Sequence, residues 1–148
     1  MRLVRRAWAG LLLAGVLGCG GESADAVAVS GTVTRDGNPL PDAVVTFHPE
    51  GATKGLGGSG RTGADGRYTL TPARGGKGIP PGDYTVVVSR PLRPDGSPPD
   101  PNVPPIESDA RETLPAIYSN RDASTLRAKV SQEAKVHDFA LKTTPKKQ

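Results

Sequence analysis

Few residues of this sequence carry the chemistry that catalysis or metal binding requires. The chain has one cysteine, Cys19, and two histidines, His48 and His137. A nucleophile needs a base placed beside it, and a catalytic metal needs three or more ligands. The histidines stand 89 residues apart, with no second His or Cys at ligand spacing. We therefore predict no catalytic residue, no metal ligand and no cofactor-binding residue.

The two histidines are better explained by structure than by metal binding. His48 precedes Pro49 at the end of an expected strand, so we predict that it lies at the surface or at a sheet edge. His137 shares its side of an expected strand with Phe139, which predicts partial burial. Neither residue has the neighbours that a zinc site needs.

Other polar motifs also have simpler interpretations. The pairs Asp65-Gly66 and Gly82-Asp83 suit tight turns, whereas a calcium site needs about six to eight converging oxygens. The glycines of 55–60 lack the Gly-Lys-Ser/Thr ending of a phosphate-binding loop. Basic side chains are frequent in the middle of the chain, and we interpret them as a solvated face: Arg61, Arg67, Arg74, Lys77, Arg90 and Arg93.

The first 19 residues are typical of an export signal. Three arginines precede an apolar run at 7–17, which is shorter than the ~20 residues of a membrane-spanning helix. The run ends in Val16-Leu17-Gly18-Cys19, which resembles the lipobox of bacterial lipoproteins. The resemblance implies a signal peptide at 1–18, acylation of Cys19 by chains such as palmitate, and a short tether at 19–26. The alternative is an ordinary secretory signal with an incidental cysteine.

Composition limits the kinds of partner. After Cys19 there are 16 basic and 15 acidic side chains, a balance that does not indicate nucleic acid as a partner. Aromatic residues are only 4% of the chain, too few to form a stacking platform for bases. With 19 glycines and 15 prolines, the core must be small and consist mainly of Val, Ala and Leu.

The elements that position these residues are predicted to be short strands. The stretch 63–90 contains two turn signals, each followed by a strand, at 67–70 and 84–89. In the second strand Tyr84, Val86 and Val88 fall on one face, which predicts a sheet with that single face buried.

Four further segments alternate in the same way, at 27–34, 43–47, 125–130 and 136–141, and no segment shows helical periodicity. The glycine-rich stretch 51–60 is expected to be a mobile loop. The proline-rich stretch 91–105 is expected to be an extended, solvated insertion. The apolar patch 114–118 is expected to dock on the edge of the domain. In the first of these segments Val27, Val29, Gly31 and Val33 share one face. The side chains predicted to point inward in the other three are Ala43, Val45, Phe47, Leu126, Ala128, Val130, Phe139 and Leu141.

Several motifs together resemble one family. Gly31-Thr32-Val33, the stretch from Gly37 through Pro39-Leu40 to Val45-Thr46-Phe47, the turn and strand at 62–70, and Pro81-Gly82-Asp83-Tyr84 occur in the order found in carboxypeptidase regulatory-like domains. Residues 114–141 resemble the end of small bacterial lipoproteins with this domain. The resemblance implies an antiparallel, seven-stranded transthyretin-like (prealbumin-like, Ig-like) β-sandwich over 27–142, without catalytic residues of its own. Residues 143–148 then form a disordered basic tail.

Three functional hypotheses follow. The first is a non-enzymatic structural or interaction module, anchored by lipid outside the cytoplasm and contacting an envelope protein or glycan through 51–60, 91–105 or a sheet edge. The second is a carbohydrate- or peptide-binding module, which requires Tyr68, Tyr84 and Tyr118 to form an exposed cluster. The third is a transthyretin-like hydrolase, which requires His48, His137 and several arginines to converge. The chain lacks the Tyr-Arg-Gly-Ser ending of those hydrolases.

Overall fold

A computed structural model describes residues 25–143 of the chain. The predictions for 1–18, for most of the tether and for 144–148 lie outside the described residues. The described part is built from short strands and loops, with a single helical turn, α1 (Ala116–Ser119). The all-β class predicted from the alternating segments is confirmed.

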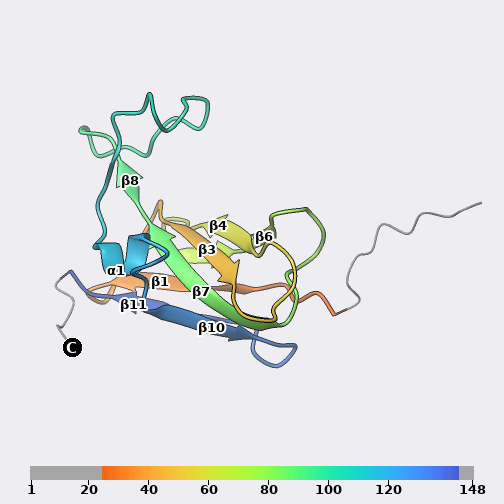
Figure 1. Cartoon of the computed structure of the whole chain (residues 1–148). Helices are drawn as coiled ribbons and strands as arrows, with labels where there is room; N and C mark the ends of the chain where they lie inside the picture. The colour runs from red at the N-terminus through yellow and green to blue at the C-terminus, as the bar shows by residue number, and fades with distance from the viewer. Residues whose placement is uncertain (1–24, 144–148) are drawn as a thin grey trace, which may run out of the picture.

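One sheet is built around β1 (Ser30–Arg35) (Figure 1). Strand β11 (Phe139–Leu141) pairs with one side of β1, and β2 (Asn38–Pro39) and β5 (Arg67–Thr69) pair with the other. The β1–β11 pair is parallel, with Val33 opposite Phe139. Here the prediction of a wholly antiparallel arrangement is wrong. No hairpin joins these strands, so the long connection between them permits either direction.

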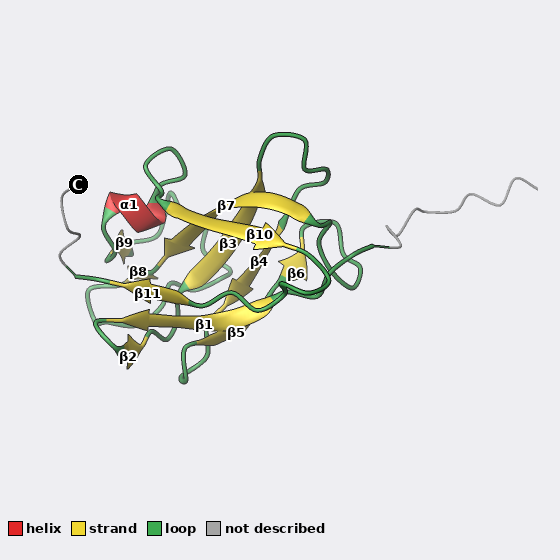
Figure 2. Cartoon of the chain, turned by 90° about the horizontal axis from the view of Figure 1, so that it is seen from below, coloured by secondary structure: helices red, strands yellow, loops and turns green. Residues whose placement is uncertain are grey.

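The second sheet is antiparallel throughout. Its strand order is β10 (Leu126–Val130), β7 (Gly82–Ser89), β3 (Val44–Pro49), β4 (Gly58–Arg61) and β6 (Thr71–Pro72). Only Leu70 separates β5 from β6, so the chain passes directly from the first sheet to the second at this point. Figure 2 shows β11, β1 and β5 in one layer and β10, β7 and β3 in another.

One hydrophobic core lies between these two layers. The ring of Phe47 in β3 contacts Phe139 in β11 and Tyr84 in β7, at centroid distances of 6.2 and 5.8 Å. Every predicted inward side chain is buried except Leu126, which is half-buried. Tyr84, Val86 and Val88 have no exposed surface. The period-two assignments are therefore confirmed.

Three local predictions are corrected by the structure. Strand β7 is covered on both faces, because Thr85 and Val87 on the opposite side are also buried. The end of the glycine-rich stretch is not a loop: Gly58–Arg61 forms β4 between β3 and β6. No helix was expected, but the end of the apolar patch 114–118 enters the helical turn α1 (Ala116–Ser119), where the hydroxyl of buried Tyr118 accepts a hydrogen bond from the Lys142 amide.

A third, two-stranded sheet stands apart from the layers. Strands β8 (Pro91–Leu92) and β9 (Arg111–Glu112) pair antiparallel and form the base of a long excursion of the chain. Figure 1 shows this excursion extending away from the body of the molecule, on the side opposite the N-terminal end of the described chain. We call residues 93–110 the arm.

Candidate functional site

The two histidines do not converge in one site, as the hydrolase hypothesis requires. The imidazole of His137 packs against the Phe47 ring, with 5.9 Å between centroids. His48 follows Phe47 directly on β3, and neighbouring side chains of a strand point to opposite faces. The two histidines therefore lie on opposite sides of the second sheet, His137 on the core side with Phe47 and His48 on the other. Burial and the positive charge of Arg121 lower the pKa of His48, so its neutral form is favoured.

The tyrosines do not form the exposed cluster that sugar binding would use. Tyr68, Tyr84 and Tyr118 are all buried. The Tyr68 hydroxyl donates to the carbonyl of His137 at 2.7 Å, and that of Tyr84 donates to the carbonyl of Pro80 at 2.6 Å. Burial raises the pKa of both phenols. All three rings belong to the core.

Two other findings concern only residues 25–143. Within this range, no three His, Cys, Asp or Glu side chains gather in a group able to hold a metal ion. Also within it, no helix has the length and apolar character needed to cross a membrane.

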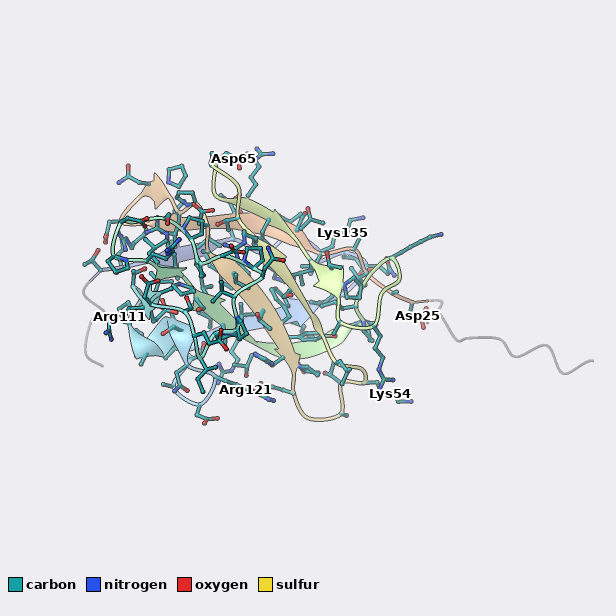
Figure 3. The ribbon with its side chains drawn as sticks, turned by 90° about the horizontal axis from the view of Figure 1, so that it is seen from above. Asp25, Lys54, Asp65, Arg111, Arg121 and Lys135 are labelled. Carbon is teal, nitrogen blue, oxygen red and sulfur yellow. The ribbon has the colours of Figure 1, made fainter. Side chains whose placement is uncertain are left out.

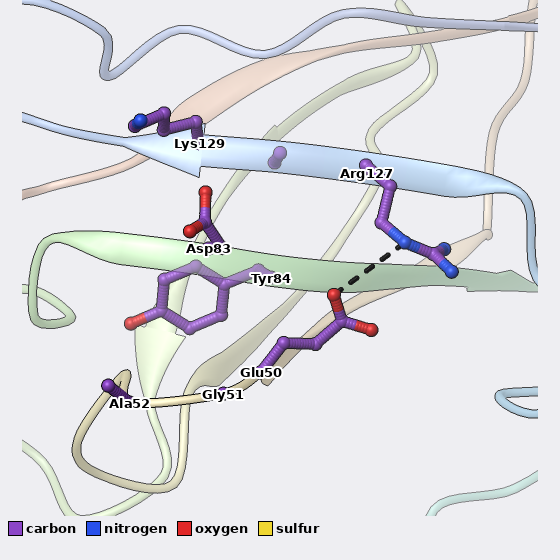
Figure 4. A pocket seen from close by; sticks show the side chains of 8 residues that line it. Glu50, Gly51, Ala52, Asp83, Tyr84, Arg127 and Lys129 are labelled. Carbon is purple, nitrogen blue, oxygen red and sulfur yellow. Dashed lines mark ion pairs between the residues drawn. The ribbon is translucent and has the colours of Figure 1, made fainter.

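A polar hollow of about 480 Å³ lies on the outer face of the second sheet (Figure 4). Its charged residues are Glu50, Asp83, Arg127 and Lys129. Arg127 and Glu50 form an ion pair at 3.7 Å, and Glu50 also accepts a hydrogen bond from the buried hydroxyl of Thr85. Both oxygens of the Glu50 carboxylate therefore have partners within the protein. Because Glu50 and Arg127 bind each other, the hollow is better explained as a polar sheet surface than as a ligand site.

The arm is the most distinctive surface of the molecule. Residues 94–110 include four acidic side chains and no lysine or arginine. Within the arm, Ile106 is 93% exposed and Val103 is 38% exposed. An exposed isoleucine gains free energy when a partner covers it, because burial of apolar surface contributes about 25 cal/mol per Å². The arm therefore offers an apolar contact surrounded by negative charge.

The arm is held in shape by its own hydrogen bonds. The Asp95 carboxylate accepts from the amide and hydroxyl of Ser97 at 2.9 and 2.6 Å. The Asp100 carboxylate accepts from the amide and side chain of Asn102 at 2.8 and 3.0 Å. These bonds lower the pKa of both carboxyls. Since the turns are preformed, binding through the arm needs less ordering than binding through an unstructured loop.

The base of the arm is fixed to the body by Glu112. One carboxylate oxygen accepts from the backbone amides of Arg90, Thr113 and Leu114 at 2.8–2.9 Å. The other accepts from the Ser89 hydroxyl at 2.6 Å. Across the arm, Arg93 pairs with Asp109 at 3.3 Å. Glu112 thus attaches the arm to the end of β7, a central strand of the second sheet.

The sequence identified this region but not its important residues. The prolines of 91–105 indicated a solvated insertion, and the structure places the insertion outside both layers. Ile106 lies just beyond the predicted range, among acidic residues, and its exposure had no clear signal. The role of Glu112 depends on partners up to 23 residues away in the chain.

Comparison of the chain with protein-family models, with curated proteins and with solved structures gives no match. The function is therefore inferred from the chain itself: the sequence around Cys19, the order of the strand and turn motifs, and the arm.

Proposed function

We propose that this chain is a lipid-anchored protein outside the cytoplasm of a bacterium, with a non-enzymatic domain of the carboxypeptidase regulatory-like, transthyretin-like type. In this proposal the domain is an interaction module of the cell envelope, and the arm is its contact surface for a protein partner. The finer assignment of a seven-stranded sandwich belongs to the same proposal. It is supported by the order of the motifs and by two sheets around a common core.

The observation that carries the proposal is the exposed Ile106 on a preformed acidic arm. Isolated exposed apolar residues are common on protein surfaces. Ile106 differs because it is 93% exposed in a segment that contributes no residue to the core and is still fixed by Glu112. A partner groove that is apolar with a basic rim would complement this surface.

The contact surface can be tested by crosslinking in cells. A photoreactive amino acid at position 106 is expected to capture one predominant protein. The same probe at exposed Ala64, in a turn of the body, is the matched control. Addition of Glu107→Lys to the position-106 probe should reduce capture if the acidic surround directs binding, because this change reverses a charge without removing a hydrogen bond of the turns. Equal capture from positions 64 and 106, or capture insensitive to the charge change, would contradict the arm as the contact surface.

The lipid anchor is tested separately by metabolic labelling with an alkyne analogue of palmitate. The wild-type chain is expected to take up the label, and Cys19→Ala is expected to lose it and to be released from the membrane fraction. An unlabelled wild-type chain would disprove the anchor. The labelling is the deciding measurement, since an unprocessed signal segment can hold the variant at the membrane by itself.

A further inference from the structure

The N-terminal end of the described chain is surrounded by three loops, at 51–57, 73–80 and 131–135. The backbones of Val27 and Ile79 exchange two hydrogen bonds at 2.8 and 2.9 Å. Gln132 donates its side-chain amide to the carbonyl of Asp25 at 3.3 Å. Gly55 in turn lies against the Pro80 ring. We call these three loops together with Asp25 the tether end.

The tether end is basic. Its loops contain four exposed basic residues, Lys54, Arg74, Lys77 and Lys135. The acidic residues of the same segments are Asp25 and Glu133, which gives a net charge of +2. The three ion pairs found within residues 25–143 involve none of the four basic residues. Figure 3 shows Lys54, Lys135 and Asp25 toward one end of the molecule and Arg111 at the other.

An apolar side chain accompanies these charges. Leu56 lies two residues after Lys54 and is 56% exposed. Its neighbours Gly55 and Gly57 both have positive φ, at 89° and 71°, so the leucine stands at a turn of the loop. Basic side chains beside an exposed apolar one are typical of surfaces that rest on anionic lipid. The cations interact with the headgroups while the apolar group enters the interface.

The distance to the proposed anchor is short. Asp25 is six residues after Cys19. A fully extended chain spans at most ~3.3–3.6 Å per residue, so Asp25 lies within about 20 Å of an acylated Cys19. If Cys19 is anchored as proposed above, the tether end is the part of the described domain that this short link keeps nearest the bilayer.

We propose that the tether end docks on an anionic membrane surface, with its basic side chains on the headgroups and Leu56 at the interface. This proposal rests on the lipid anchor of the proposed function and adds a second contact to it. Docking of this kind holds the acidic arm away from a surface of its own charge. The molecule is then oriented as well as retained.

The experiment uses the full chain, processed and acylated in cells, and reconstituted into vesicles. Acylation occupies the thiol of Cys19, so Leu56→Cys supplies the free thiol for an environment-sensitive fluorophore. Vesicles of phosphatidylcholine are compared with vesicles in which part of it is replaced by phosphatidylglycerol. We expect emission to shift to the blue and to be quenched by brominated lipid in the anionic vesicles only. Both effects should decline as salt is raised, because salt screens the charges.

The matched control reverses the same number of charges away from the tether end. Lys54→Glu, Arg74→Glu and Lys77→Glu together are expected to weaken docking roughly a hundredfold, since each of the three basic residues near an anionic surface contributes about fivefold. Arg93→Glu, Arg111→Glu and Arg121→Glu together should leave it unchanged. Single variants such as Lys77→Gln provide smaller steps if a triple variant is unstable.

Two results would overturn the proposal: the same emission in both kinds of vesicle, or equal loss from the two triple variants. Failure of the anchor itself is recognised separately, because the chain then takes up no palmitate label. If the chain takes up the label but its emission is the same in neutral and anionic vesicles, the anchor is supported and the docking is disproved.

Discussion

The glycine-rich stretch 51–60 and the proline-rich stretch 91–105 have similar signals in the sequence but different roles in the structure. The end of the first stretch enters the second sheet as β4. At Gly57, Gly58 and Gly60 an added Cβ would lie 1.8, 2.8 and 2.3 Å from a neighbouring backbone oxygen. The second stretch remains outside the sheets. Glycine permits close backbone packing, whereas proline removes the donors on which pairing depends.

The comparison shows that low hydrophobicity alone does not predict a surface loop. A segment without side chains can be buried because its backbone fits where no side chain could. The glycine-rich stretch thereby contributes to the stability of the body, while the proline-rich stretch is available for contacts.

The largest difference is expected for apolar side chains. Tyr84→Ala should reduce the free energy of unfolding by about 3–5 kcal/mol, because the ring is fully buried against Phe47. Ile106→Ala should change it by less than about 0.5 kcal/mol, since 93% of that side chain is exposed. Chemical denaturation measures both values. An equally stable Tyr84→Ala variant would refute the assignment of Tyr84 to the core.

A smaller difference is expected between two glycines of similar backbone geometry. Gly57 and Gly96 have φ of 71° and 82°, so alanine meets similar backbone strain at each, of about 1–2 kcal/mol. Only at Gly57 does the new Cβ meet a backbone atom, the Phe47 oxygen at 1.8 Å; at Gly96 it meets nothing within 4 Å. We expect a loss of about 3 kcal/mol for Gly57→Ala and about 1 kcal/mol for Gly96→Ala. Similar losses would mean that the chain entering β4 is not tightly packed against β3.

Removal of residues 94–104 should have little effect on folding. Leu92 of β8 pairs directly with Arg111 of β9, so the residues that remain between them, 93 and 105–110, can close the chain. We expect a change below about 1 kcal/mol, because loop-closure entropy depends only weakly on loop length. Thermal unfolding of the deletion variant measures this. A collapse of stability would show that the arm supports the body.

The smallest effect concerns pH, and its sign differs between the two regions. The lowered pKa values of Asp95 and Asp100 mean that their turns are favoured above about pH 4 and open as pH falls through those values. The raised pKa values of Tyr68 and Tyr84 mean that the core is favoured below about pH 10 and weakens above it. A pH titration followed by NMR should detect the amides of Ser97 and Asn102 shifting as Asp95 and Asp100 are protonated in acid, and the surroundings of Tyr68 and Tyr84 changing only in alkali. Turns of the arm that stay unchanged in acid, or phenols that ionise near neutral pH, would contradict these assignments.

The sequence was sufficient for the parts of the fold that depend on local alternation. Tyr84, Val86 and Val88 could be assigned to the core from spacing alone, because period two fixes the face of each side chain. The strand at Gly58–Arg61 could not be predicted in this way, since its place depends on partners in β3 and β6 that accept a bare backbone. The direction of β11 beside β1 had no local signal either.

For the candidate site, the insertion could be located from the sequence, but the residues that attach it and that form its contact surface could not. Prolines mark a segment that cannot enter a sheet, and this physical limit is readable from composition. The attachment of the arm through Glu112 depends on donors at Ser89 and Arg90 that only folding brings close. The exposure of Ile106 is likewise a property of the folded surface. The assignment of Cys19 as the acylated residue, in contrast, depends on sequence alone.

The parallel alignment of β1 and β11 has a mechanical consequence. The described chain begins at one end of the molecule and finishes at the other (Figure 1). A pull between a fixed front end and a load at the rear would drag these neighbouring strands in opposite directions along their length. Every bond in the register from Val33–Phe139 to Arg35–Leu141 would then bear the load together, instead of opening one after another. Such a shear geometry suits a domain held at one end and grasped at the other.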